Sequence, residues 1–172
     1  MLFRSNFPVR NYDASKGDDQ FRRGLYTWWQ RSFLHPSMLA FDAPSREECA
    51  AERTRSNIPQ QALVLLNDPT YVESARAFAA RIVQEANGDA TARIAWAWKQ
   101  ALARAPRPDE LATARALFDK HLAQYQADPK AAESLLKVGI APLPEAAAQP
   151  ELAAWTSVAR VILNLHETIT RS

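Results

Sequence analysis

The sequence is short of the residues on which several classes of functional site depend. Only one of its 172 residues is cysteine, Cys49, and only four are glycine. A single cysteine excludes an intramolecular disulfide and a metal centre held by several thiolates, and no Cys-x-x-Cys-His is present to attach haem. The chain also has neither a phosphate-binding glycine loop nor a Gly-x-Ser-x-Gly nucleophile elbow. The usual signatures of nucleotide binding and of serine-hydrolase chemistry are therefore missing.

Long apolar runs and an excess of one charge are missing as well. No apolar run approaches the roughly 20 residues that a helix needs to span a bilayer. Twenty-one Lys and Arg against nineteen Asp and Glu leave a net charge of +2, which is too small to indicate a nucleic acid or an anionic membrane. We therefore expect no nucleic-acid partner and no membrane span. The start, MLFRSNFPVRNYD, has no apolar h-region and so no signal peptide.

Histidine is equally sparse. His35, His121 and His166 are scattered, and none of them belongs to a His-x-x-x-His pair that would place two ligands on one helical face. We predict no metal site and no cofactor in this chain. His121 falls beside an apolar stripe, which favours a residue at the edge of the core.

The sequence does contain several motifs that typically begin helices. Asp68-Pro69 and Asp128-Pro129 combine a capping carboxylate with a proline in the first helical turn, and Asp89, Pro108 and Pro150 begin further segments. Apolar residues at spacings of three and four follow each start and predict helices. No strand pattern competes. We predict an all-α fold, an irregular multi-helix bundle of about six to seven helices with an extended N-terminal segment.

The same periodicity predicts which residues are buried. The stripes expected to face the core include Val72, Ala75, Ala79, Ile82, Val83 and Ala86; Ile94, Trp98, Ala101 and Leu102; Leu111, Ala114, Leu117, Phe118, Leu122 and Tyr125; and Leu152, Trp155, Ala159, Ile162 and Leu163. Two further helices are expected, one starting at Ser45 and one at Pro59, and the run from Ala62 to Leu66 is expected to be buried. RRGLYTWWQRSFLHP also has helical spacing, and we interpret Leu25, Trp28 and Trp29 as core rather than as a platform for stacking nucleic-acid bases.

Polar side chains concentrate in residues 42–68, the one place where the sequence suggests a site. The candidate ligand-binding residues are Asp42, Arg46, Arg53, Arg55, Asn57, Gln61, Asn67 and Asp68. Such a density of arginine, carboxylate and amide groups suits two roles, a charge-assisted network that fixes loops or a pocket for a carboxylate, sulfate or sugar. We favour the first. Cys49, with no histidine nearby in sequence, is interpreted as a small buried residue.

Several motifs in the same region resemble one known family. Arg22 to Thr27 (RRGLYT), Phe41 to Pro44 (FDAP), Asn57 to Leu63 (NIPQQAL) and Leu66 to Pro69 (LNDP) follow the pattern of the C-terminal domain-of-unknown-function family 1553 of planctomycete and verrucomicrobial cytochrome-associated proteins. The ending, ELAAWTSVARVILNLHETITR, is similar to the family's terminal helix. Where the family usually has aspartate and phenylalanine in that terminal motif, this chain has His166 and Thr168.

The resemblance implies a larger protein. Such proteins carry an upstream domain, sometimes a cytochrome c module, and an export signal, so haem c is possible only in a missing upstream module. Export to the periplasm or cell surface, and a part in polysaccharide breakdown with carbohydrate as a possible ligand, are also implied. We expect residues 1–5 to be an artefact or a linker, since LFRS is also encoded by the end of a common sequencing adapter, and residues 6–172 to form a single helical domain.

The function that follows is a non-catalytic helical module that packs against the upstream domain. The alternative is a hydrolase or a carbohydrate- or anion-binding domain that uses residues 42–68. The family carries no settled activity, so whether this chain is an enzyme is left open, with the balance against it.

Overall fold

The computed structural model describes residues 17–22, 24–27, 35–44, 49, 51–52, 56–143 and 149–170. Helices make up its regular structure, and no strand occurs in these residues. Two short 3-10 helices and eight α-helices follow one another as η1 (Gly17–Phe21), η2 (Gly24–Tyr26), α1 (Pro36–Ala40), α2 (Pro59–Asn67), α3 (Pro69–Glu85), α4 (Ala90–Leu102), α5 (Pro108–Ala127), α6 (Pro129–Leu136), α7 (Gln149–Leu163) and α8 (His166–Ile169). The all-α prediction is confirmed. The predicted extended segment at the start and the predicted helix at Ser45 lie outside the described residues.

The predicted carboxylate caps begin three of these helices. Asp68 accepts a hydrogen bond from the backbone N–H of Thr70 (2.9 Å), and Asp89 accepts one from Ala92 (3.0 Å). Asp128 accepts from the first two free N–H groups of α6. Each carboxylate satisfies backbone donors that have no partner inside the helix and also lies at the positive end of the helix dipole.

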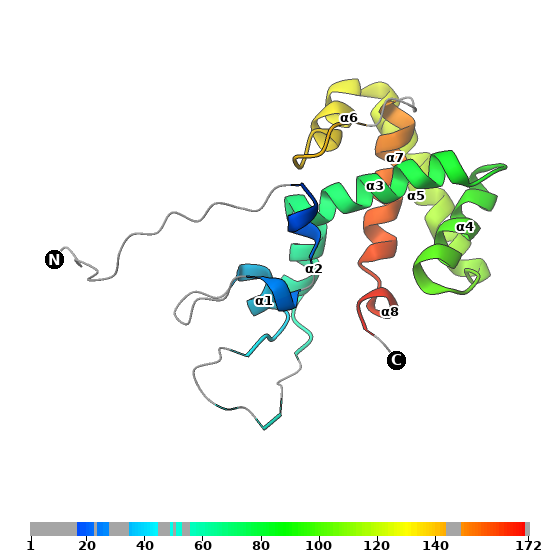
Figure 1. Cartoon of the computed structure of the whole chain (residues 1–172). Coiled ribbons are helices and arrows are strands. Elements are labelled where there is room, and N and C mark those ends of the chain that lie inside the picture. Colours follow the sequence, from blue (N-terminus) through cyan, green and yellow to red (C-terminus); the bar gives the residue numbers. More distant parts are fainter. Residues whose placement is uncertain are drawn as a thin grey trace.

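Helix α7 is the centre of the core. It packs against α3 along one side and α5 along another, while α6 covers its beginning (Figure 1). Every residue from Leu152 to Ala159 is buried, and so is Ile162. The rings of Trp155 on α7 and Phe118 on α5 lie 4.3 Å apart between centroids. The inward face predicted for this helix is confirmed, except that Leu163 is only half-buried.

Small side chains let α3 and α7 approach each other closely. Ala75 and Ala79 of α3 and Ala153, Ala154 and Ala159 of α7 are at most 1% exposed. An alanine adds little beyond the backbone cylinder, so the two helices pack at short range where they cross (Figure 1).

The N-terminal part of the fold contradicts three predictions about burial. No residue of α2 is buried, so the expectation for Ala62 to Leu66 is wrong. The reason is that α2 lies at the margin of the described helices, where its main contacts are with α1, α3 and α7. Leu25 is 75% exposed rather than part of the core, and Cys49 is exposed rather than buried. Trp28 and Trp29 lie outside the described residues.

Candidate functional site

The predicted polar segment forms two small clusters. In the first, the Asp42 carboxylate accepts hydrogen bonds from the backbone N–H (2.6 Å) and the hydroxyl (2.9 Å) of Ser56. Gln61 donates from Nε2 to the Ser56 carbonyl (3.1 Å). Asp42 has a φ of 55°, a left-handed conformation that aspartate tolerates better than most residues. This cluster connects the turn after α1 to the entry of α2.

The second cluster surrounds the junction of α2 and α3. Asp68 caps α3 through one carboxylate oxygen and lies 3.4 Å from the Ser37 hydroxyl through the other. Asn67 donates instead to the carbonyl of Leu63 in its own helix (3.0 Å). Arg160 of α7 donates to the carbonyl of Leu66 at the end of α2. The junction is thereby attached to α1 and to the central helix.

The structure thus brings together Asp42 and Gln61 through Ser56, and it places Asp68 in a separate cluster. Asn57 is exposed at the start of α2. Arg46, Arg53 and Arg55 lie outside the described residues, so a pocket formed by all eight candidates stays a prediction.

A pair of buried charges that the sequence reasoning missed closes the loop after α6. Glu73 and Arg76 of α3 are 2% and 3% exposed. Glu73 accepts from the backbone N–H groups of Ile140 and Ala141, and Arg76 donates to the carbonyls of Leu136 and Ala141. Burying these charges is tolerated because each makes charge-assisted hydrogen bonds to backbone groups. The sequence signal that could have identified them as buried is their position within the stripe that contains Val72, Ala75 and Ala79.

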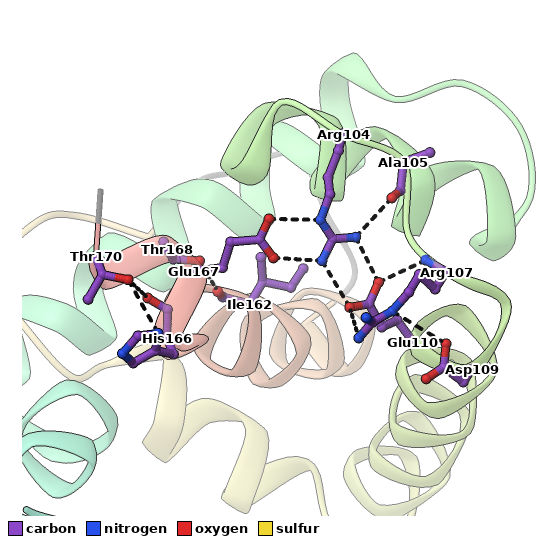
Figure 2. A network of polar contacts seen from close by, with 10 residues as sticks. All are labelled: Arg104, Ala105, Arg107, Asp109, Glu110, Ile162, His166, Glu167, Thr168 and Thr170. Carbon is purple, nitrogen blue, oxygen red and sulfur yellow. Dashed lines mark hydrogen bonds and ion pairs between the residues drawn. The ribbon is translucent and has the colours of Figure 1, made fainter. Parts of the chain in front are cut away.

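A larger ionic network fixes the C-terminal helix to the α4–α5 connection (Figure 2). Arg104 makes paired hydrogen bonds to Glu110 at the start of α5 (2.9 Å each) and to Glu167 in α8 (2.8 and 2.7 Å). Glu110 also accepts from the backbone N–H of Arg107 (2.8 Å), as in a capping box. One guanidinium therefore joins three segments of the chain.

The network shifts the protonation of its carboxylates. The hydrogen bonds from Arg104, followed by that from the Arg107 N–H, lower the pKa of Glu110 from 4.5 to about 2. Hydrogen bonds from Arg104 also lower the pKa of Glu167, and the two carboxylates together raise the pKa of Arg104. Perturbed pKa values mark functional sites and structural ion pairs alike. Here the charged groups hydrogen-bond to one another, so we interpret this network as structural.

Glu167 clarifies the departure in the terminal motif. Although His166 and Thr168 replace the residues expected from the resemblance, the acid between them is retained and binds Arg104. Thr168 donates to the carbonyl of Ile162 (2.7 Å), and Thr170 donates to that of His166 (2.7 Å), so the motif's polar groups close the chain onto the end of α7.

A pocket of about 380 Å³ opens where α4, α5 and α7 meet. Phe118, Leu122 and Trp155 form its apolar wall, with Ala90 and Pro150 at the starts of α4 and α7. Its polar side chains are Arg93, Gln126 and Glu151, of which Arg93 and Glu151 form an ion pair of 2.7 Å. The sequence stripes contain the apolar members, but the pairing of α4 with α7 across 58 residues left no local signal.

No cluster of three or more His, Cys, Asp or Glu side chains suited to a metal ion occurs in the part of the chain that the structure describes. Among the described helices, none combines the length and the apolar character required to cross a bilayer.

By its fold the chain is an all-α protein organised around one buried helix. Residues 3–118 match the family PSD1, described as a protein of unknown function (DUF1553). The match spans more than half of the 172 residues, so the chain belongs to this family, and the resemblance seen in the motifs between Arg22 and Pro69 is confirmed. Neither a curated protein nor a solved structure matches the chain. The match ends within α5, while the central helix α7 lies beyond it.

Proposed function

We propose that this chain is a non-catalytic helical module of a larger exported protein and that it packs against an upstream domain of that protein. The observation that carries the proposal is the distribution of apolar surface. Among the described residues, ten large apolar side chains are exposed, and six of them come from residues 17–67. No residue of that segment whose burial the structure describes is buried.

The six side chains define what we call the N-terminal apolar surface: Phe21, Leu25, Tyr26, Leu39, Ile58 and Leu63. All except Ile58 are more than half exposed. Single exposed apolar residues are ordinary, but a concentration of them in one part of a chain is characteristic of an interaction surface. The segments that carry these residues, blue and cyan in Figure 1, lie to one side of α4 and α5.

Polar contacts hold in place α1 and α2, the two α-helices that contribute to the N-terminal apolar surface. Asp68 joins α3 to the side chain of Ser37 in α1, and Arg160 joins the end of α2 to α7. Asp42 and Gln61 close the entry of α2 around Ser56. Because these contacts set the position of α1 and α2 before any partner binds, association loses less conformational entropy than it would with a free segment.

The position of this surface in the chain favours an upstream occupant. Its residues precede the core, so a domain joined on that side is held nearby at a high effective concentration. Export to the periplasm or cell surface, haem c in the upstream module and a part in polysaccharide breakdown are supported by the family resemblance alone, and we include them in the proposal on that basis.

The test is binding between the 172-residue chain and the upstream region encoded by the full-length gene, made as a separate protein. We expect saturable binding by calorimetry, and we expect Leu39→Ser combined with Leu63→Ser to weaken it at least about tenfold. The control combines Leu143→Ser and Val161→Ser, two exposed apolar residues outside the N-terminal apolar surface. Absence of binding, or equal losses in the two double variants, would overturn the proposal.

A further inference from the structure

The pocket between α4, α5 and α7 has the size and lining of a small-molecule site. Its volume of about 380 Å³ falls within the range of about 300–1,000 Å³ typical of ligand pockets. A dry cavity of about 150 Å³ already accepts benzene, so this one has room for a ring and a polar substituent. The tilted pair of Phe118 and Trp155 is buried beneath this lining, with the half-buried Leu122 beside them, and gives the pocket an apolar base that suits a flat ring.

Two N–H donors on the pocket's lining residues are unpaired. Trp155 is fully buried, and its indole Nε1 makes no hydrogen bond within the described structure. Arg93 uses Nη1 for Glu151, whereas its buried Nε has no partner there. Both nitrogens lie beneath the pocket surface, so a ligand oxygen reaches either one only when the side chains around it shift. It then removes the cost of about 1–3 kcal/mol that a buried donor without an acceptor carries.

The charges of the pocket select an uncharged ligand. Arg93 and Glu151 already neutralise each other at 2.7 Å. A ligand carboxylate would lose its hydration and meet the negative charge of Glu151, while a ligand cation would meet that of Arg93. Glu151 and Gln126 also present acceptor oxygens at the same pocket, which suit a ligand that donates N–H groups.

We propose that this pocket binds a small uncharged ring compound that carries a carboxamide. The ring packs on Phe118, Leu122 and Trp155. The carbonyl oxygen accepts from the unpaired N–H of Trp155 or Arg93, and the amide N–H groups face Glu151 and Gln126. The proposal is independent of the N-terminal apolar surface, because no residue of that surface lines the pocket.

The test uses benzamide as the probe, with toluene lacking the polar group and benzoate adding a charge. In the ¹⁵N-labelled 172-residue chain, the Trp155 indole N–H signal should move downfield on titration with benzamide. The signal is assigned by its loss in Trp155→Phe. A Kd on the order of 1 mM is expected for a fragment of this size. Toluene and benzoate should each bind at least about tenfold more weakly, since one lacks the hydrogen bond and the other carries an uncompensated charge.

Two variants of α5 locate the binding. Leu122→Trp fills the pocket and should abolish the benzamide response, whereas Ala116→Trp, on the exposed face of the same helix, should retain it. A cooperative thermal unfolding transition in each variant checks that both are folded. The proposal is overturned if benzamide leaves the Trp155 signal unmoved in the unaltered chain, if toluene or benzoate binds as tightly, or if Leu122→Trp and Ala116→Trp respond alike.

Discussion

At the scale of single residues, buried charges close the loop that follows α6. Glu73 and Arg76 supply the hydrogen bonds that residues 136–141 do not make among themselves. The backbone must come very near α3 for this to happen. Gly139 makes that approach possible, with a φ of 101° and a position where a Cβ would lie 2.8 Å from the Cβ of Glu73 and closer still to its carboxylate.

Gly139→Ala is therefore expected to lower the free energy of unfolding by more than the roughly 1–2 kcal/mol that a left-handed alanine costs. The added methyl displaces Glu73 from its backbone donors. Gly88→Ala is the matched control, since Gly88 has almost the same φ, 102°, and its added Cβ would meet only the Cβ of Ala92 at 3.1 Å. Urea unfolding followed by circular dichroism measures both. Equal losses of stability in the two variants would show that the hydrogen bonds of Glu73 do not require the close approach of the Gly139 backbone.

Glu110 gives a prediction about pH. Its pKa is lowered from 4.5 to about 2 in the folded chain, so its contribution to stability is fully present above about pH 4.5 and is lost as the pH falls towards 2. Glu110→Gln should cost about 2 kcal/mol at neutral pH, because hydrogen bonds to a charged partner are removed. The loss should shrink at pH 3.

Urea titrations at pH 7 and pH 3 check this prediction. Glu85→Gln removes a carboxylate from an exposed pair with Arg81 and should change stability less. A Glu110→Gln loss that is the same at both pH values would mean that the ionised carboxylate does not stabilise the network.

Local and distant partners explain which residue roles the sequence revealed. Asp68, Asp89 and Asp128 cap helices through N–H groups two or three residues away, so a short motif identifies them. Arg104 binds Glu167 across 63 residues, and no local pattern specifies that pairing. The candidate site in residues 42–68 was identified as polar, but its division into two clusters depends on how α1 and α2 fold back.

At the scale of elements, the burial of a helix depends on how many neighbours surround it. Helices α2 and α7 both carry apolar runs, yet α7 contacts every other α-helix from α2 to α8, whereas the main contacts of α2 are with α1, α3 and α7. Periodicity predicts a helix and its apolar face, but not whether the opposite face is also covered. For that reason the prediction succeeded for α7 and failed for α2.

The close packing of α3 and α7 gives a prediction at this scale. Ala79→Leu should lower stability by about 1–3 kcal/mol, the usual cost of overpacking a core, because Ala79 is completely buried. Ala116→Leu, on the exposed side of α5, introduces the same side chain without the crowding. Thermal unfolding distinguishes them. If Ala79→Leu unfolds at the temperature of Ala116→Leu, the two helices have more room than their alanines indicate.

At the scale of the whole molecule, the chain divides into a buried core and an apolar margin. The core is formed by α3 to α7, although the family match ends within α5, so the folded unit extends past the matched residues. The N-terminal apolar surface lies within the match. Its exposure has no structural explanation within the described chain, and a partner domain explains it directly.

Hydrogen exchange of residues 35–67, compared between the 172-residue chain and the full-length protein, tests this central claim most directly. Packing against the upstream domain should slow the amides of α1 and α2 by about tenfold or more in the full-length protein, since the partner suppresses local opening. The amides of α5, on the far side of the core, provide the internal reference and should exchange alike in both. Equal exchange of α1 and α2 in the two proteins would contradict the account.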